Sequence, residues 1–264
     1  MVMAVGYLLA VLSSVFNGSF VAFAKLQSVA SVDLHPILFN FYVTCGVAAS
    51  SCLVIPWVLA RPGELRFVYQ GAIGGCLFVG ASSLSFVAAK NLGLSTGQGV
   101  WSGAAIVVAF AWGSLGPPPV GAPLTSLPLS LLAILLLLLG VAGMVKCEPL
   151  GRLCFGTQQN NDDEPLNSDT PAGPKASARA VGLTAALAVG LFGGSILVPL
   201  AFISDEIGAV PSFGAGALVG GALITAAWYA LEASRGAPPA LELRATLWAG
   251  LLSGLVWNAG SPAG

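Results

Sequence analysis

Charged residues are scarce in this chain. Only 8% of its 264 residues are Asp, Glu, Lys or Arg, whereas 56% are hydrophobic. A soluble globular domain carries roughly 25% charged residues, so the composition excludes a mainly water-exposed surface. No charged residue occurs between Lys90 and Lys146. That stretch has room for two membrane spans and a turn, because one span needs about 20 apolar residues.

Other scarcities exclude classes of function. The net charge is −1, so we expect no basic surface for nucleic acid. One histidine and five cysteines without a Cys-x-x-Cys pair predict no metal site and no cofactor. Cys45 and Cys52 are better explained as small packing residues than as a disulfide. The chain has no Walker loop and no His-Glu-x-x-His motif, so we expect that it is not an enzyme.

Long apolar segments dominate what remains. Charged residues fall at the edges of these segments, as expected for membrane spans. The first segment has no basic n-region and is too long for the core of a signal peptide. The sequence predicts an all-α, polytopic membrane helix bundle of about eight transmembrane helices. Their approximate limits are 2–24, 36–60, 67–89, 94–115, 125–146, 180–203, 211–231 and 245–260.

The only long hydrophilic stretch covers residues 147–179. It is rich in Asn, Gln, Asp and Pro, a composition typical of a disordered loop. We expect this loop to join two halves of the chain. The predicted organisation is therefore a first five-helix repeat at 1–146, the loop at 147–179, and a second repeat of three helices at 180–264.

Short motifs recur between these halves at offsets of 176, 175 and 179 residues. The matches pair Phe16-Asn17-Gly18-Ser19 with Phe192-Gly193-Gly194-Ser195, Pro36 with Pro211, and Gly71, Gly75 and Phe78 with Gly250, Gly254 and Trp257. A nearly constant offset indicates an internal repeat. Five spans separate each unit from its copy, and an odd number inverts the copy in the membrane. A 5+5 repeat is incomplete here, so we expect two further helices, roughly 50 residues, to be missing.

Loop charge predicts the orientation, because Lys and Arg concentrate on the cytosolic side. Eight of the ten basic residues fall on one side of the predicted map, which places the N-terminus outside. These eight are Lys25, Lys90, Lys146, Arg152, Lys175, Arg179, Arg235 and Arg244, against Arg61 and Arg66 on the other side.

Polar side chains within the spans are few, and no acid lies deep in a span. This pattern disfavours an intramembrane proton relay and favours a neutral polyol or an exchanged metabolite as solute. The candidate substrate-path residues are Asn17, Ser19, Asn40, Tyr42, Gln98, Trp101, Ser195, Trp257 and Asn258.

The roles of several candidates stay open. Gln98 and Trp101 share one helical face, which could bind a solute or simply pack. The Asn17 amide could bond a neighbouring helix or line a path. Lys25 and Lys90 close two spans, either as snorkelling anchors or as charges at the end of a path.

Three segments resemble a known family. Gly18-Ser19-Phe20-Val21-Ala22-Phe23-Ala24-Lys25 resembles the first-helix signature of the transmembrane protein 144 family, and the second half keeps Gly194-Ser195 with Val198-Pro199. Residues 92–103 resemble the segment that enters the family's fourth helix, and Trp257-Asn258-Ala259-Gly260 resembles a run in its later helices. The family belongs to the drug/metabolite transporter superfamily. The resemblance implies ten helices in two inverted repeats and transport of carbohydrate or a related metabolite.

The leading hypothesis is a multi-pass carrier that moves a sugar or sugar-like metabolite by alternating access, with the small solute and the lipid bilayer as its partners. Two alternatives stay open. One is export of amino acids or other metabolites, as in other branches of the superfamily. The other is a non-transporting membrane scaffold.

Overall fold

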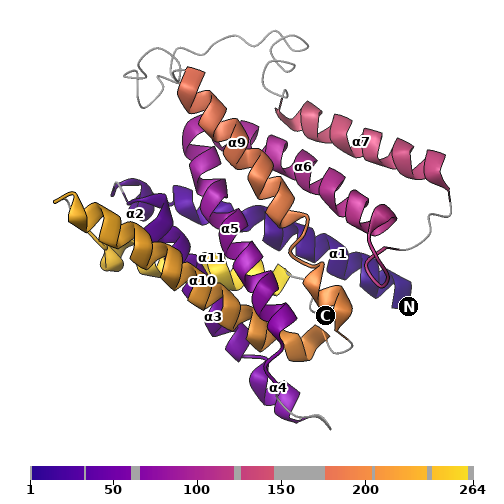
Figure 1. Ribbon diagram of the computed structural model, residues 1–264, viewed down its shortest axis with the longest axis horizontal. Coiled ribbons are helices and arrows are strands. Elements are labelled where there is room, and N and C mark those ends of the chain that lie inside the picture. Colours follow the sequence, from indigo (N-terminus) through magenta and orange to yellow (C-terminus); the bar gives the residue numbers. More distant parts are fainter. Residues whose placement is uncertain are drawn as a thin grey trace. The chain divides into compact units, whose positions relative to one another are not determined.

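The regular secondary structure of the described chain is helical. The computed structural model describes residues 2–32, 34–60, 66–121, 126–145, 176–203, 206–236 and 240–260, and no strand occurs among them. The elements, labelled in Figure 1, are α1 (Val2–Ser19), η1 (Phe20–Lys25), α2 (Gln27–Ala30), α3 (Pro36–Cys52), α4 (Ile55–Leu59), α5 (Tyr69–Leu92), α6 (Leu94–Leu115), α7 (Leu127–Val145), α9 (Ala176–Gly193), η2 (Pro199–Phe202), α10 (Glu206–Ser234) and α11 (Leu243–Gly260).

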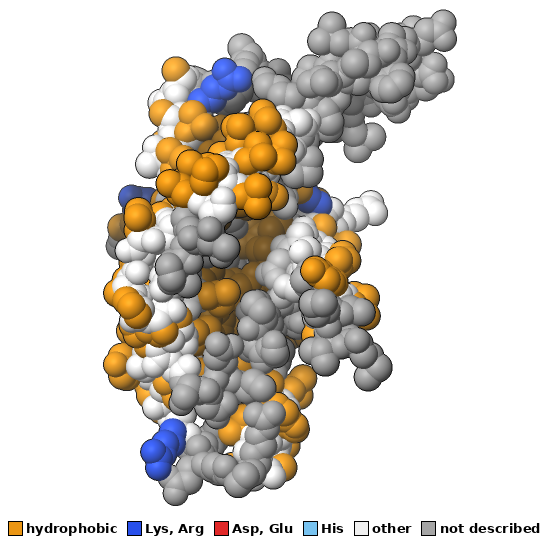
Figure 2. All heavy atoms as spheres, turned by 90° about the vertical axis from the view of Figure 1, so that its right-hand side faces the viewer, with side chains coloured by type: hydrophobic (Ala, Val, Ile, Leu, Met, Phe, Trp, Pro, Cys, Tyr) orange, Lys and Arg blue, Asp and Glu red, His pale blue; other side chains and the backbone are white. Residues whose placement is uncertain are grey.

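The described residues contain six helices that are long and apolar enough to cross a membrane. They are Gly6–Lys25, Pro36–Leu59, Tyr69–Leu92, Leu94–Leu115, Ala176–Gly193 and Gly208–Ser234. The apolar part of α7, Leu127–Gly143, is shorter. α11 is not among the six, and its sequence includes Arg244, Thr246, Ser253 and Asn258. On the face shown in Figure 2, hydrophobic side chains are spread over the described helices, and Lys and Arg side chains are few and isolated.

Three predicted boundaries differ from the structure. The second span is interrupted, because α3 ends at Cys52 and α4 begins at Ile55 with Pro56 in its first turn. α9 begins at Ala176, inside the predicted 147–179 loop; residues 147–175 lie outside the described part of the chain. Pro211 was expected to open a helix and does not, because α10 begins at Glu206 and Pro211 lies inside it.

Two compact units divide the chain, and the division falls within α5. The first contains Met1–Ser83 and Ser195–Gly264, and the second contains Leu84–Gly194. Each unit takes residues from both of the predicted sequence repeats. The helices below are described within their own unit.

In the first unit, α3 packs closely on α11 (Figure 1). A Cβ on Gly46 would overlap the Leu251 carbonyl, and a Cβ on Gly254 would overlap the Val43 carbonyl. Glycine at both positions lets the backbones touch, as in other membrane helix pairs. A Cβ on Gly250 would overlap Tyr42 Cβ, and further along both helices Asn258 donates to Ser50, so α3 and α11 run parallel.

The pair α10 and α5 packs with the same register. A Cβ on Gly216 of α10 would overlap the Ala72 carbonyl of α5, just as a Cβ on Gly46 of α3 would overlap the Leu251 carbonyl of α11. A Cβ on Gly75 of α5 would overlap the Phe213 carbonyl of α10, just as a Cβ on Gly254 of α11 would overlap the Val43 carbonyl of α3. The residues of α3 and α10 in these matched contacts are 170 apart, and those of α5 and α11 are 179 apart. The starts of α3 and α10, Pro36 and Glu206, are also 170 apart, so Pro36 matches Glu206 rather than Pro211.

The contact between α3 and α10 also has matched positions that are 170 residues apart. A Cβ on Gly221 would lie 2.5 Å from Thr44 Oγ1, and a Cβ on Gly214 would lie 2.5 Å from Ser51 Cβ. Thr44 and Gly214 are 170 residues apart, as are Ser51 and Gly221. Each contact is therefore the counterpart of the other. Residue numbers rise along α3 as they fall along α10, so these two helices are antiparallel.

The second unit is built from the end of α5 with α6, α7 and α9. Ala88, Ala185 and Ala186 form its buried centre, and Trp101 packs against them. α6 packs on α9 through Gly190 and Gly194. Small residues again allow close approach, because lipid supplies no hydrophobic drive between helices.

Candidate functional site

The first unit contains seven of the nine candidate path residues. They are Asn17, Ser19, Asn40, Tyr42, Ser195, Trp257 and Asn258. Gln98 and Trp101 belong to the second unit. The polar and aromatic core of the first unit is therefore the candidate site.

Three aromatic rings form the centre of this core. Trp257 of α11 lies with its ring centroid 4.0 Å from that of Phe78 of α5 and 5.7 Å from that of Phe213 of α10. The Trp257 and Phe213 rings are stacked, with 12° between their planes. All three side chains are buried. Phe78 and Trp257 are the pair that the sequence repeat had matched, whereas sequence reasoning missed Phe213.

Asn258 connects α11 to α3. Its Nδ2 donates to Ser50 Oγ at 2.9 Å and to Ser51 Oγ at 3.3 Å. Hydrogen bonds of this kind stabilise packed membrane helices. The amide is thus engaged in packing in this conformation.

Asn40 presents a different arrangement. Its side chain is only 2% exposed, and Nδ2 donates to Ser83 Oγ at 2.8 Å. Its Oδ1 is buried and has no hydrogen-bond partner in the described chain. An unpaired buried acceptor costs about 1–3 kcal/mol. Such a group has unused capacity for a donor such as a solute hydroxyl.

Two hydroxyls hold the segments that precede helices. The Tyr42 hydroxyl donates to the carbonyl of Leu241, just before α11. Ser212 Oγ accepts from the backbone N–H of Val68, just before α5, at 2.9 Å. Tyr42 and Ser212 are 170 residues apart, so they are equivalent positions of the two helix pairs, and each bonds the backbone just before the partner helix. Tyr42 is explained as a packing residue here.

The first and sixth spans are both interrupted near their Gly-Ser motifs. α1 ends at Ser19 and continues as η1, and α9 ends at Gly193 before η2. Ser253 Oγ donates to the Phe20 carbonyl at 2.8 Å, so it satisfies backbone at the break. At the other break, a Cβ on Gly74 would lie 3.1 Å from the Ile196 carbonyl oxygen. Phe20 and Ile196 are 176 apart, and Gly74 and Ser253 are 179 apart.

Asn17 and Ser19 lie in the last turn of α1, just before the first break. Asn17 Nδ2 donates to the Gly260 carbonyl of α11 at 2.7 Å, which favours the role of bonding a neighbouring helix. Ser19 Oγ donates to the Phe16 carbonyl of its own helix at 3.2 Å. Ser195 begins the second break, and its side chain is half-buried.

The remaining candidates have structural placements. Trp101 packs into the alanine core of the second unit, which favours packing over solute binding for this face; Gln98 is half-buried beside it. Lys25 ends η1 and Lys90 lies in the last turn of α5, and both are exposed. Those positions suit anchors at the membrane surface.

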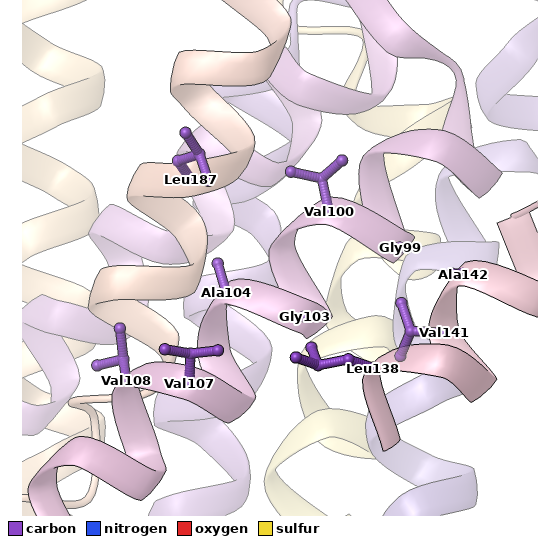
Figure 3. A pocket seen from close by; sticks show the side chains of 10 residues that line it. All are labelled: Gly99, Val100, Gly103, Ala104, Val107, Val108, Leu138, Val141, Ala142 and Leu187. Atoms are coloured by element: carbon purple, nitrogen blue, oxygen red, sulfur yellow. The ribbon is translucent and has the colours of Figure 1, made fainter. Parts of the chain in front are cut away.

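A separate open apolar groove of about 670 Å³ lies among α6, α7 and α9 in the second unit. Its lining includes Val100, Val107, Leu138, Val141 and Leu187, and every side-chain atom drawn in Figure 3 is carbon. These walls offer no side-chain hydrogen bond to a sugar. The groove therefore fits hydrocarbon rather than the predicted solute.

Comparisons with protein-family models, curated proteins and solved structures found no match. The described residues contain no group of three or more His, Cys, Asp or Glu side chains that could hold a metal ion. Amides, hydroxyls and aromatic faces supply the chemistry of the site. In the described chain these uncharged groups bond or stack mainly on one another, and Asn40 Oδ1 is a buried polar atom without a partner.

Proposed function

We propose that this chain is a multi-pass membrane carrier of the drug/metabolite transporter type, similar to the transmembrane protein 144 family, and that it moves a sugar or sugar-like metabolite by alternating access. One observation carries the proposal. The Thr44–Gly221 and Ser51–Gly214 contacts are counterparts across antiparallel α3 and α10. An antiparallel pair of equivalent helices is the arrangement expected of an inverted repeat.

An inverted repeat supports alternating access for a physical reason. When two halves have equivalent packing but opposite orientation, each half can adopt the other's conformation. The exchange converts an outward-open state into an inward-open state of comparable energy. The matched Gly75 and Gly254 contacts would allow one helix pair to loosen as the other tightens.

Helix directions support eight crossings. α3 runs parallel to α11, and α1 runs antiparallel to it, since Asn17 bonds Gly260 whereas Ser253 bonds Phe20. In the second unit α6 runs parallel to α9. Consecutive membrane spans alternate in direction. The observed directions therefore match a chain in which α7 and α11 cross the membrane as well. An incomplete 5+5 repeat fits the same pattern.

The solute class follows from the site chemistry. Asn40 Oδ1 has capacity for a hydroxyl donor, and Trp257, which is stacked on Phe213 in this conformation, would offer a ring face to a sugar when the helix pairs separate. A neutral polyol matches these groups without requiring a buried counter-charge.

The test is solute uptake by the purified full chain in proteoliposomes. We expect saturable counterflow of at least one labelled monosaccharide, and reduced counterflow in Asn40→Leu. The panel includes amino acids, which would identify the exporter alternative. Absence of uptake and exchange across the whole panel would reject the carrier.

A membrane scaffold is the second candidate, because the Asn17 and Asn258 amides are both engaged in bonds between helices. A scaffold predicts that Asn40→Leu changes no solute flux. The same assay therefore separates the two functions.

A further inference from the structure

The open apolar groove of the second unit matches one membrane leaflet in length. Its lining on α6 extends from Gly99 to Val108. Leu138 and Ala142 of α7 and Leu187 of α9 belong to its sides. Nine residues of helix rise about 14 Å, and one leaflet's share of the membrane hydrocarbon is about 15 Å thick. The groove therefore has the length of one lipid acyl chain.

A basic residue lies on the helix ridge that leads into this groove. Arg179, Leu183 and Leu187 of α9 are spaced four residues apart, so they follow one another along one face of the helix. Arg179 is exposed, Leu183 is 44% exposed and Leu187 is 56% exposed. This ridge is therefore open from the cation near the start of α9 to the side of the groove.

Arg179 lies at the level where α6 begins. Gly194 of α9 meets Val108 of the parallel helix α6, which precedes it by 86 residues. The same spacing sets Arg179 level with Gly93, the residue before α6. The groove begins at Gly99, about 9 Å further along α6. This separation leaves room for the glycerol part of a lipid between a phosphate on Arg179 and a chain in the groove.

Charge complementarity identifies the headgroup. The described residues of the second unit include two basic residues, Lys90 and Arg179, and no Asp or Glu. A guanidinium can bind a phosphate through two parallel hydrogen bonds. Ser95, which is exposed one turn before Gly99, adds a hydroxyl at the same end of the groove. This end suits an anionic phosphate, whereas the groove itself suits hydrocarbon.

We infer that the groove binds an anionic glycerophospholipid, with one acyl chain along α6 and the phosphate on Arg179. Arg179 belongs to the basic group predicted to face the cytosol, and the cytosolic leaflet is the one rich in anionic lipid. Lipid binding here does not depend on transport. The test uses no solute, so failure of the carrier proposal would leave its result unchanged.

The experiment measures fluorescence quenching by brominated lipids. The full chain, in a cysteine-free background, carries a bimane label at Leu183→Cys in phosphatidylcholine vesicles. Phosphatidylglycerol or phosphatidylcholine with brominated chains replaces the same fraction of the lipid in parallel samples. We expect the anionic lipid to bind about fivefold more tightly, the factor that corresponds to about 1 kcal/mol for one basic residue near the membrane surface.

Variants of Arg179 test the headgroup contact. Arg179→Gln should abolish the preference for anionic lipid, and Arg179→Lys should keep part of it. Lys90→Gln is the matched control, because it removes the same charge from the same end of the unit. Lys90 lies about 200° around α5 from Leu92, and Leu92 is the residue that meets Gly182 of α9. Lys90→Gln should therefore leave the preference unchanged.

Two substitutions on α7 test the place of the acyl chain. Ala142 lines the groove, so Ala142→Phe should fill it and lower the quenching by either lipid. Ala133→Phe makes the same change at an exposed residue on the opposite face of α7, nine positions earlier. It should leave the quenching unchanged.

Four outcomes would overturn the inference. The first is equal binding of the anionic and zwitterionic lipids. The second is a preference that Lys90→Gln reduces as much as Arg179→Gln, since that is general attraction to the membrane surface. The third is an equal effect of Ala142→Phe and Ala133→Phe. The fourth is weak quenching by both lipids, which would assign the groove to a protein segment, from this chain or from a second copy.

Discussion

The side-chain amides of Asn258 and Asn40 differ in their hydrogen bonding within the first unit. Asn258 donates to two serines of α3, whereas Asn40 donates to Ser83 and its Oδ1 is buried without a partner in the described chain. Bonded amides stabilise, and an unbonded polar atom costs stability. Their substitution should therefore affect stability and function differently.

Asn258→Ala should lower the free energy of unfolding by about 0.6–1.7 kcal/mol, the range for hydrogen bonds between membrane helices. Denaturant unfolding in detergent micelles measures this change. Asn91→Ala is the matched control, because Asn91 Nδ2 bonds Val87 of its own helix at 2.8 Å. An equal loss in both variants would contradict a specific role between helices.

Asn40→Leu removes the orphan acceptor and replaces the amide with an apolar group of similar size. We expect the free energy of unfolding to change by less than about 1 kcal/mol, because the cost of the unpaired atom is relieved. Solute counterflow should nevertheless fall. Ser83→Ala is the control for loss of the single bond. A large loss of stability in Asn40→Leu would show that the amide is structural.

Glycine contacts determine how the helices pair. The carbonyls of Val43 and Phe213 occupy the space where a side chain on Gly254 or Gly75 would begin. Neither helix backbone can yield without separating the pair. These contacts are the element-scale basis of the matched α3–α11 and α10–α5 packing.

Gly254→Ala and Gly75→Ala should each destabilise the protein by about 1–3 kcal/mol, the usual cost of overpacking. Thermal unfolding in micelles measures the loss. Gly113→Ala, where the added Cβ would meet no described atom within 4 Å, should be neutral or slightly stabilising. Similar effects at all three glycines would contradict specific packing.

The sequence predicted the helices better than their registers. Hydropathy identified the membrane segments because lipid demands uninterrupted apolar helices. Pro211 misled the repeat alignment because proline marks helix starts only on average, and here the preceding turn remains helical. Asn258 could not be assigned to Ser50 and Ser51, since that contact depends on how α11 packs on α3. Trp101 was ambiguous for the same reason.

At the scale of the molecule, helix direction and charge agree for the first unit. His35 before α3 stacks on Trp228 of α10, with ring centroids 4.2 Å apart. The start of α3 therefore lies beside the last part of α10. Lys25 and Arg235 flank these ends and belong to the basic group assigned to the cytosol.

Cysteine labelling in intact cells tests this orientation. In a cysteine-free background, Ser31→Cys and Arg235→Cys should react only after the membrane is permeabilised. Phe67→Cys, at an exposed side chain before α5, should react from outside without permeabilisation. The opposite pattern would reverse the orientation. Labelling of Ser31→Cys and Arg235→Cys from different sides would refute the antiparallel topology.

The contact between α3 and α10 has a consequence for self-association. Two identical half-chains meeting across such an axis would present the same side chains to each other, hydroxyl against hydroxyl or glycine against glycine. Here Thr44 and Ser51 project from α3, and Gly221 and Gly214 receive them on α10. The contact face of α3 therefore carries the projecting side chains (the knobs), and that of α10 carries the glycine gaps that receive them (the holes). Each half is thereby committed to the other, and a pairing of two α3 helices from different molecules would bring knob against knob.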